Sequence, residues 1–345
     1  MSTADRGAAR PDRTAGEAAQ AALAELFRHA DGTVDDDPWP LVREVAGSGD
    51  RSAVAPVRAA LQRYARERNW YGRDLMAHVL AGLSGAAGFP LLLRTYADAL
   101  RGEDEDDGER LGMALGVAMR VDRAGCRAVI LPLLAGEDPE LRRAALWALR
   151  GVFEPPDLET LRAALADPEP AVRRAALHAL PRVDHDPLAY ELVVAALRDP
   201  DAEARRHAVL LLAWSAPPAV VDHLVPLAAD PVPYVRSSVG EALGRRAAGS
   251  DRVPVAAAAL RGLLADDGPS VRAGAIRGLG LLGGPLDALA ARIDDPDWWV
   301  RATLAEVLAV ALLRWPPARP LLARLADDSN PTVRATATRA LHAPA

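Results

Sequence analysis

A charged pair that returns at a fixed spacing constrains this chain more than any other feature. In the copy DPEPAVRRAALHAL, Asp167 is followed six positions later by Arg173 and then by an Ala-Ala-Leu-x-Ala-Leu segment. The same spacing of six separates the pairs Asp199/Arg205, Asp230/Arg236, Asp266/Arg272, Asp295/Arg301 and Asp328/Arg334. From Leu141 to Val333, the residue before the arginine recurs at intervals of 31, 32, 31, 36, 29 and 33 residues. Such a period indicates a solenoid, in which each helix pair buries its apolar face by stacking on its neighbours.

The composition fits a chain of short helices with a large core. The 345 residues are 50% hydrophobic and only 4% aromatic, and Ala, Leu, Arg and Asp dominate. The 28 prolines and 26 glycines fall at regular intervals, as expected for turns between helices. We therefore predict an all-α solenoid of stacked antiparallel helix pairs, with about eight or nine repeats.

The repeat divides the chain into three parts. Residues 1–14 are small and charged without periodicity, which predicts a disordered N-terminal tail. Residues 15–122 contain amphipathic segments that match the repeat loosely, which predicts capping helices and degenerate repeats. Residues 123–345 follow the period regularly, which predicts regular repeats in one continuous solenoid.

The Asp-x5-Arg spacing, the Ala-Ala-Leu-x-Ala-Leu segment and the short period resemble HEAT repeats, especially the short variety found in phycobilin lyase subunits. The resemblance is clear over 138–342 and loose over 38–122, and it implies a right-handed α-solenoid. It also implies that the aspartates and arginines form a ladder of ion pairs between successive repeats. Independently, an aspartate before a helix can cap its free amides, and an arginine fork can bridge carboxylates. The copy at Arg142 departs, because its aspartate, Asp138, comes only four residues earlier.

Several kinds of chemistry are excluded or disfavoured. All 41 basic residues are arginine, which excludes mechanisms that need lysine, such as a P-loop or a Schiff base. Cys126 is the single cysteine and lies in an apolar run, so we expect a buried hydrophobic residue. We predict no catalytic residues, no cofactor and no metal site, and a cytoplasmic location. The segment Gly278-Leu-Gly-Leu-Leu-Gly283 matches a dinucleotide motif, but no strand precedes it, and helix C-caps explain its glycines better.

The candidate binding face follows from helical geometry. If the residue before the repeated arginine is position 0, positions 0, +4 and +8 form the buried stripe, and +2, +6 and +10 lie opposite. In proteins with such repeats these positions line the concave groove. The middle of this face is rich in arginine, tryptophan and histidine, and becomes mixed towards the C-terminus. The candidate groove residues are Arg143, Trp147, Arg174, His178, Arg182, Arg206, His207, Trp214, Glu241 and Arg245.

Three classes of function remain open. The first is a non-catalytic scaffold or adaptor that holds a protein partner, possibly an acidic one, in the concave groove. The second is nucleic-acid binding, including a DNA-glycosylase-like activity. A net charge of −6 argues against it, and only Asp74 and Glu241 could supply its carboxylate. The third is an enzyme or lyase-chaperone for a small acidic or carrier-tethered substrate. Alternatively, the arginines form an ordinary solvated face and the tryptophans pack between helices.

Overall fold

The computed structural model describes residues 15–102, 108–184, 186–283, 286–312 and 315–342. Within these ranges the chain consists of α-helices, short 3₁₀ helices and loops, with no β-strand, which confirms the all-α prediction. The expected tail, residues 1–14, lies outside the described residues. The chain divides into two compact units, unit 1 (Met1–Thr160) and unit 2 (Leu161–Ala345).

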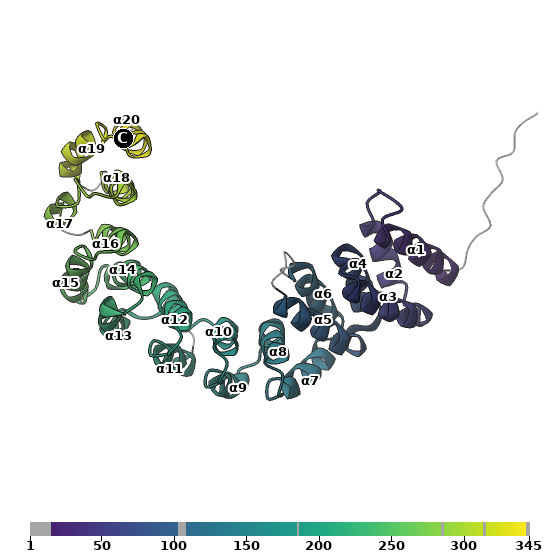
Figure 1. Cartoon of the computed structure of the whole chain (residues 1–345). Helices are drawn as coiled ribbons and strands as arrows, with labels where there is room; N and C mark the ends of the chain where they lie inside the picture. Colours follow the sequence, from purple (N-terminus) through teal and green to yellow (C-terminus); the bar gives the residue numbers. More distant parts are fainter. Residues whose placement is uncertain (1–14, 103–107, 185, 284–285, 313–314, 343–345) are drawn as a thin grey trace, which may run out of the picture. The chain divides into compact units, whose positions relative to one another are not determined.

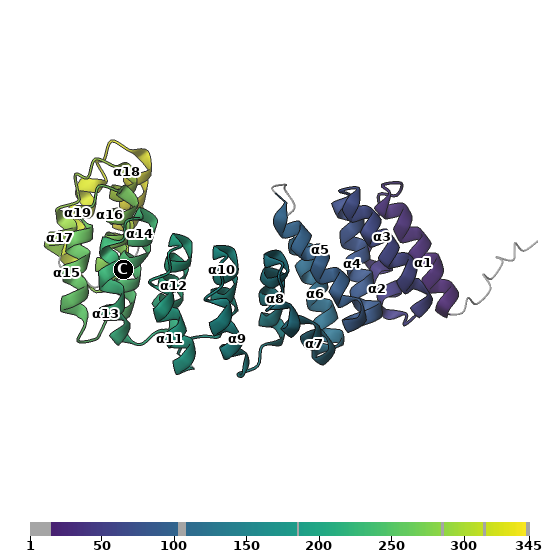
Figure 2. The same ribbon diagram turned by 60° about the horizontal axis from the view of Figure 1, so that its bottom comes forward.

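Unit 1 is built around α4, which packs against α2, α3 and α6, while α8 packs against α5 and α7 (Figure 2). The side chains of Tyr64, Phe89 and Leu93 are fully buried between these helices. The helices of unit 1 are α1 (Ala15–Ala30), α2 (Trp39–Gly47), α3 (Val54–Arg66), α4 (Trp70–Ser84), α5 (Phe89–Arg101), α6 (Glu109–Val121), α7 (Arg123–Leu133) and α8 (Pro139–Val152). Helix α9 (Asp157–Ala164) carries the boundary to unit 2.

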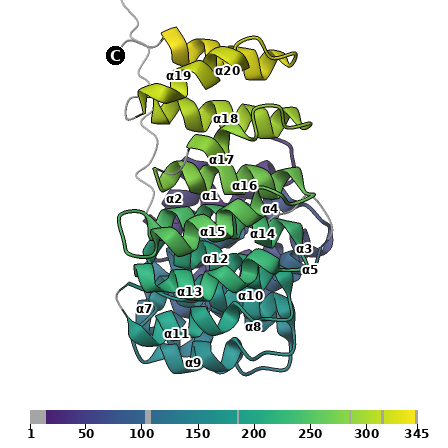
Figure 3. The ribbon, with the colours of Figure 1, turned by 90° about the vertical axis from the view of Figure 1, so that its left-hand side faces the viewer.

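Unit 2 is a stack of helix pairs (Figures 1 and 3). Its even-numbered helices pack on one another in chain order and form one layer, which we call the inner layer. The odd-numbered helices lie together on one side of the inner layer and pack against it. The helices are α10 (Pro170–Ala179), α11 (Pro187–Ala196), α12 (Ala202–Ser215), α13 (Val221–Leu224), α14 (Pro233–Ala247), α15 (Val253–Leu263), α16 (Pro269–Leu281), α17 (Leu286–Ala290), α18 (Trp298–Ala311), α19 (Arg319–Leu325) and α20 (Pro331–His342).

The helical period places the core of unit 2 where the sequence predicts it. In α10 the side chains at positions 0, +4 and +8, Val172, Ala176 and Leu180, are all buried. Proline occupies the first turn of α10, α14, α16 and α20, where its missing N–H costs no intrahelical hydrogen bond. These four inner helices therefore start at a proline, whereas α12 and α18 start after the N-caps Asp201 and Asp297.

The aspartate–arginine ladder is present in unit 2. Each arginine donates from Nε and Nη2 to the two carboxylate oxygens of the aspartate in the next repeat, over 2.6–3.0 Å. Its Nη1 also donates to the backbone carbonyl of its own repeat's aspartate. The bidentate pairs are Arg173–Asp199, Arg205–Asp230, Arg236–Asp266, Arg272–Asp295 and Arg301–Asp328. Each arginine thus links two successive turns through a charge-assisted fork.

The role expected for the ladder aspartates as helix caps is wrong. The carboxylate of Asp199 accepts the N–H of Asp201 at 2.8 Å, and Asp201 is itself the N-cap of α12. Asp230 accepts the N–H of Val232, the N-cap of α14, in the same way. The aspartate therefore lies two residues too early to reach the helix amides. It instead fixes the turn that leads into the helix, as short Asp side chains commonly do.

The departing copy at Arg142 keeps part of the pattern. The Nη1 atom of Arg142 donates to the carbonyls of Gly136 and Glu137, both at 2.9 Å, which are the positions five and six residues earlier. Asp138 instead caps α8 by accepting the N–H of Glu140, and it forms an ion pair with Arg101. The backbone contacts of the repeat therefore survive without an aspartate at the usual position.

Candidate functional site

Position +10 of the inner layer carries a row of exposed side chains that run from one repeat to the next. We call Trp214 of α12, Arg245 of α14, Leu281 of α16 and Val310 of α18 the +10 row. The exposed fractions of Trp214, Leu281 and Val310 are 67%, 42% and 80%. Large apolar side chains with such exposure, arranged in one row, are a common feature of interaction surfaces.

Position +2 is not on the open face in three repeats, contrary to expectation. Ala273 and Ala302 are 0% and 5% exposed, and Asp74 in unit 1 is 7% exposed. In unit 2 the reason is the close packing of neighbouring inner helices, which covers this side of each helix. In α16 and α18, positions +6 and +10 therefore form the accessible face, whereas Arg174 and Arg206 at position +2 of α10 and α12 keep 38% and 43% of their side chains exposed.

The close packing is tightest between α14 and α16, where glycines meet backbone to backbone. A Cβ atom added to Gly278 would lie 2.2 Å from the carbonyl oxygen of Gly240, and one added to Gly244 would lie 2.2 Å from that of Gly278. Gly278 is therefore a packing residue, and the expectation that it serves as a C-cap is wrong. Gly283, at the end of the same segment, does follow the helix with a left-handed φ of +68°.

The arginines predicted for the groove are paired with carboxylates. Arg174 contacts Asp201 at 3.0 Å and Arg206 contacts Glu203 at 3.3 Å, so their charges are matched within the protein. The remaining pairs are Arg143–Glu140, Arg182–Asp184 and Arg245–Glu241, at 2.7–2.9 Å. Five arginines thus face five carboxylates, and this surface is much less basic than the count of arginines indicates.

The structure distributes the ten predicted residues over both units. Arg143 and Trp147 belong to unit 1, where the Trp147 ring packs on Tyr96 with centroids 5.1 Å apart and beside Gly112. The other eight belong to unit 2. Trp147 is only partly exposed, so packing within its own unit accounts for this tryptophan.

Two contacts in unit 2 bring predicted residues together. The rings of His178 and His207 lie side by side, with centroids 3.7 Å apart. The guanidinium of Arg245 lies over the exposed ring of Trp214, 4.0 Å from its centroid, while its Nη2 donates to Glu241 at 2.7 Å. Such a stack holds the indole in place at the surface and leaves its other face open.

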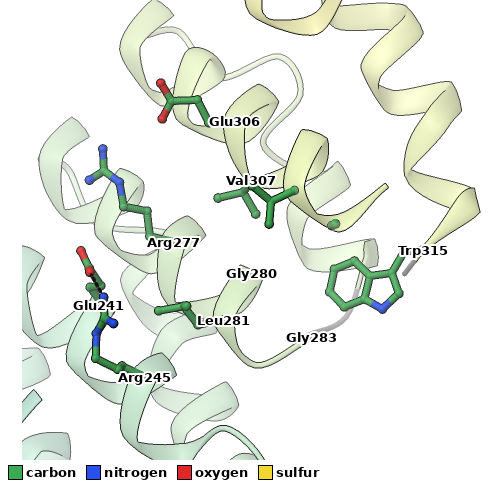
Figure 4. Close-up of a pocket in the computed structure, with 11 residues that line it drawn as sticks. Glu241, Arg245, Arg277, Gly280, Leu281, Gly283, Glu306, Val307 and Trp315 are labelled. Atoms are coloured by element: carbon green, nitrogen blue, oxygen red, sulfur yellow. Dashed lines mark hydrogen bonds and ion pairs between the residues drawn. The ribbon is translucent and has the colours of Figure 1, made fainter. Parts of the chain in front are cut away.

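A cavity of about 530 Å³ opens on the inner layer at α14, α16 and α18 (Figure 4). It has a charged side and an apolar side, and its lining includes three members of the +10 row. The lining residues are Glu241, Arg245, Arg277, Gly280, Leu281, Gly283, Glu306, Val307, Val310, Ala311 and Trp315. A smaller cavity of about 240 Å³ lies beside Trp214, between Arg182 and Leu210. The volume of the larger cavity is in the range of pockets that bind small molecules or side chains.

Most of the larger cavity lies outside the predicted groove residues. The sequence analysis predicts only Glu241 and Arg245 of these lining residues, because the face becomes mixed towards the C-terminus. Continuing position +10 beyond Arg245 would have reached Leu281 and Val310, two apolar residues on a polar face. Trp315 comes from the loop after α18, and helical spacing gives no signal for it.

The carboxylates that a base-excising enzyme would need are both occupied. Asp74 is buried and accepts hydrogen bonds from Nε and Nη2 of its neighbour Arg73 at 3.0 and 2.7 Å. Glu241 is held by Arg245. Both carboxylates are engaged by an arginine, so neither is an unpaired acid or base beside an aromatic surface. The site therefore gives no support to glycosylase chemistry.

The remaining candidate chemical groups have structural roles. Cys126 is fully buried, as expected, and burial raises the pKa of its thiol to about 12, far above that of a reactive thiolate. In the Asp184–Asp186 segment, Asp184 pairs with Arg182 and Asp186 caps α11, while His185 lies outside the described residues. Over the ranges that the structure covers, no group of three or more His, Cys, Asp or Glu side chains is placed to hold a metal.

No helix in the described part of the chain combines the length and the apolar character that a membrane span requires.

Comparison with known proteins places this repeat in a family. The sequence profile of HEAT repeats matches six overlapping segments, residues 94–181, 127–196, 158–244, 190–280, 246–309 and 286–343. No curated protein matches the sequence.

Among solved structures, similar folds occur in the karyopherin Kap121p bound to the SUMO protease Ulp1p and in yeast importin-beta (Kap95p). The first is 14% identical with a TM-score of 0.62, and covers 89% of this chain and 39% of that one. The second is 14% identical with a TM-score of 0.61, and covers 94% of this chain and 51% of that one. The chain thus spans about half or less of the length of these relatives, and the likeness concerns the fold. With its helix pairs, its ladder and the profile matches from residue 94 to 343, the chain belongs to the HEAT-repeat family.

Proposed function

We propose that this chain is a scaffold or adaptor that binds a protein partner on the inner layer of unit 2. The observation that carries the proposal is the +10 row together with the cavity beside it. Trp214, Leu281 and Val310 keep 42–80% of their surface in contact with solvent, at the same position of three inner helices. Burying such a row against a partner would remove apolar surface from water, the main source of free energy in protein association.

The family supports a partner of this class. One solved structure of similar fold, the karyopherin Kap121p, is bound to the SUMO protease Ulp1p, and Kap95p, which shares 15% identity with this chain at a TM-score of 0.57, binds RanGDP. In both cases the partner is a protein. An extended repeat surface of the present kind is suited to the same type of contact. A lyase-like role, drawn from the resemblance to phycobilin lyase subunits, has no feature of the site in its favour.

A capture experiment tests the proposal. The double variant Leu281→Asp, Val310→Asp places two charges on the +10 row, where desolvating them would oppose contact with an apolar partner surface. Immobilised wild-type protein and variant are incubated with a lysate of the native organism, and the retained proteins are quantified by mass spectrometry. We expect a set of proteins that the wild type retains and the variant loses.

The matched control is Val255→Asp on α15, which is 42% exposed but lies on an odd-numbered helix outside the inner layer. The control should retain the same proteins as the wild type, and all three proteins should show the same melting temperature within about 2 °C. Equal retention by the double variant and the wild type would remove the +10 row as the binding surface.

A further inference from the structure

We propose that the 530 Å³ cavity receives one bulky apolar side chain from an extended peptide segment of the partner. On this proposal, an acidic residue of the peptide pairs with Arg277 and a basic residue pairs with Glu306. The inference rests on the proposed function and names the chemistry of the segment that the inner layer would recognise.

The apolar side of the cavity provides the place for the side chain. Leu281, Val307 and Trp315 face the hollow from α16, α18 and the following loop (Figure 4), and Val310 is also among the lining residues. Gly280 contributes no side chain, and a Cβ atom there would lie 2.4 Å from Val307. The absence of that atom lets Val307 pack directly against α16. The result is a hollow with apolar walls, which suits a leucine or a larger apolar side chain better than a flat surface would.

On the charged side of the cavity, two side chains form an ion pair with each other and two further charged side chains do not. Glu241 and Arg245 neutralise each other at 2.7 Å. Among the described residues, the carboxylate of Glu306 has no cation or hydrogen-bond donor as a partner, and the guanidinium of Arg277 has no carboxylate. The guanidinium of Arg277 lies over the ring of Trp299, with its central carbon 5.5 Å from the ring centroid. Within the described part of the chain, the rim thus carries one positive and one negative charge without an ion-pair partner, and a complementary ligand carries one of each.

The spacing of the two charges favours an extended segment. Arg277 and Glu306 occupy position +6 of successive inner helices, whose axes are separated by about 8–10 Å. In an extended chain the side chains two positions before and after a given residue point to the same face, with Cα atoms about 13 Å apart. An acidic and a basic side chain at these positions can converge on Arg277 and Glu306 while the central side chain enters the cavity.

Blocked pentapeptides test this chemistry without terminal charges. The probes are two dye-labelled peptides, Glu-Ser-Leu-Ser-Arg and the same residues in reversed order, because the peptide could lie across the site in either direction. Binding is measured by fluorescence anisotropy. The better of the two should bind the wild-type chain saturably. Replacing its central Leu by Ala should weaken binding about tenfold, and replacing both charged residues by Gln should weaken it about fivefold.

Variants of the protein provide the matching half of the test. Arg277→Gln and Glu306→Gln should each weaken binding of the charged peptide about two- to fivefold, while leaving binding of the Gln-substituted peptide unchanged. Arg261→Gln, which removes an exposed arginine from α15, serves as the control and should bind all peptides as the wild type does.

Two outcomes would overturn the inference. One is the absence of saturable binding of either charged peptide to the wild-type chain at millimolar concentration. The other is equal binding of the charged and Gln-substituted peptides by the wild type. After either outcome, the proposed function still stands if the double variant Leu281→Asp, Val310→Asp loses the proteins that the wild type captures. If the wild-type chain binds neither peptide and the double variant captures the same proteins as the wild type, the inference and the proposed function are both wrong.

Discussion

Arg272 and Asp295 form the most buried pair of the ladder, with 9% and 0% of their side chains exposed. Arg272 makes two hydrogen bonds to Asp295 at 2.7 and 2.8 Å and two more to backbone carbonyls in the turn before its own helix. Removal of this one side chain would leave the buried carboxylate with only the more distant Arg292, at 3.7 Å, and would take the Arg272 donor away from the two carbonyls. At the scale of the residue, the ladder arginines are therefore structural.

We predict that Arg272→Ala lowers the free energy of unfolding by about 2–4 kcal/mol, because the buried carboxylate loses both hydrogen bonds of its bidentate pair and keeps only Arg292 at 3.7 Å. The control is Arg324→Ala, which breaks an Arg–Asp pair at the surface with Asp294, where 59% and 79% of the side chains are exposed. The control should cost less than about 1 kcal/mol, since exposed pairs contribute little. Urea denaturation measures both, and an equal loss in the two variants would contradict the structural role.

The ladder also predicts how stability depends on pH. Hydrogen bonds from Arg236 lower the pKa of Asp266 against the opposing effect of burial, and Arg301 lowers that of Asp328 in the same way. Burial raises the pKa of Asp295, but the hydrogen bonds from Arg272 and the N–H of Asp297 outweigh it, so the net direction is downward. A carboxyl group whose pKa is lower in the folded state binds its proton more weakly there than in the unfolded chain. Its contribution is complete above the unfolded value of about 3.9 and is lost as the pH falls through the folded value.

We therefore expect the free energy of unfolding to be nearly constant from pH 7 to about pH 5 and to fall steeply below about pH 4. In Arg272→Ala the fall should be shallower, because Asp295 then loses the hydrogen bonds from Arg272, the strongest of the effects that lower its pKa. Urea denaturation at a series of pH values tests this expectation. A fall of equal steepness in both proteins would show that this ladder pair is not coupled to proton binding.

Between helices, the contact of α14 with α16 depends on glycine. Gly240, Gly244, Gly274 and Gly278 let the two backbones touch, and an added Cβ at any of the four would come within 2.2–2.7 Å of a backbone atom across the interface. Backbone atoms cannot move away as a side chain can, so a methyl group would force the two helices apart. The position of α16, and with it Arg277 and Leu281, depends on this contact.

We predict that Gly278→Ala lowers the free energy of unfolding by more than about 2 kcal/mol through overpacking, despite the better helix propensity of alanine. The control, Gly262→Ala on α15, adds a methyl group with no atom within 4 Å and should instead stabilise by up to about 1 kcal/mol. Thermal or urea denaturation of the two variants measures the difference. A neutral or stabilising effect of Gly278→Ala would contradict the close approach of the two helices.

The helix pairs and the partners in the ladder could be predicted from the sequence because both follow from a fixed period. The buried stripe at Val172, Ala176 and Leu180 and the pairing of Arg173 with its neighbouring repeat are consequences of that period. The pairing of Arg206 with Glu203 and of Arg245 with Glu241 could also be predicted from the sequence, because side chains three and four residues apart meet on a helix.

Other features could not be obtained from the period. The ladder aspartates fix turns instead of capping helices, because the turn between repeats adds two residues before the N-cap. The cavity depends on the α14–α16 glycine contact and on Trp315, a loop residue, and neither follows a helical spacing. The separation of Arg143 and Trp147 from the other predicted groove residues depends on how the chain divides into compact units, which periodicity does not indicate.

At the scale of the whole molecule, the ladder and the proposed binding surface both lie in unit 2. Five ladder pairs hold the repeats of unit 2 together from Arg173 to Asp328, and their arginines are engaged in that role. The groove arginines predicted in the same unit are matched by carboxylates, so they do not by themselves mark a binding face. The +10 row exposes large apolar side chains at one position of successive inner helices, and we propose that this row and its cavity bind the partner.

The most direct test of this claim is to record what covers Val310. A photo-reactive amino acid is introduced at position 310, and at position 255 as the control, and each protein is irradiated in a lysate of the native organism. The account predicts that position 310 crosslinks to a defined protein that position 255 does not reach. Capture of that protein should also be lost in the Trp214→Ala variant. If positions 310 and 255 gave the same crosslinks, or if position 310 reacted only with solvent, the +10 row would not be a binding surface.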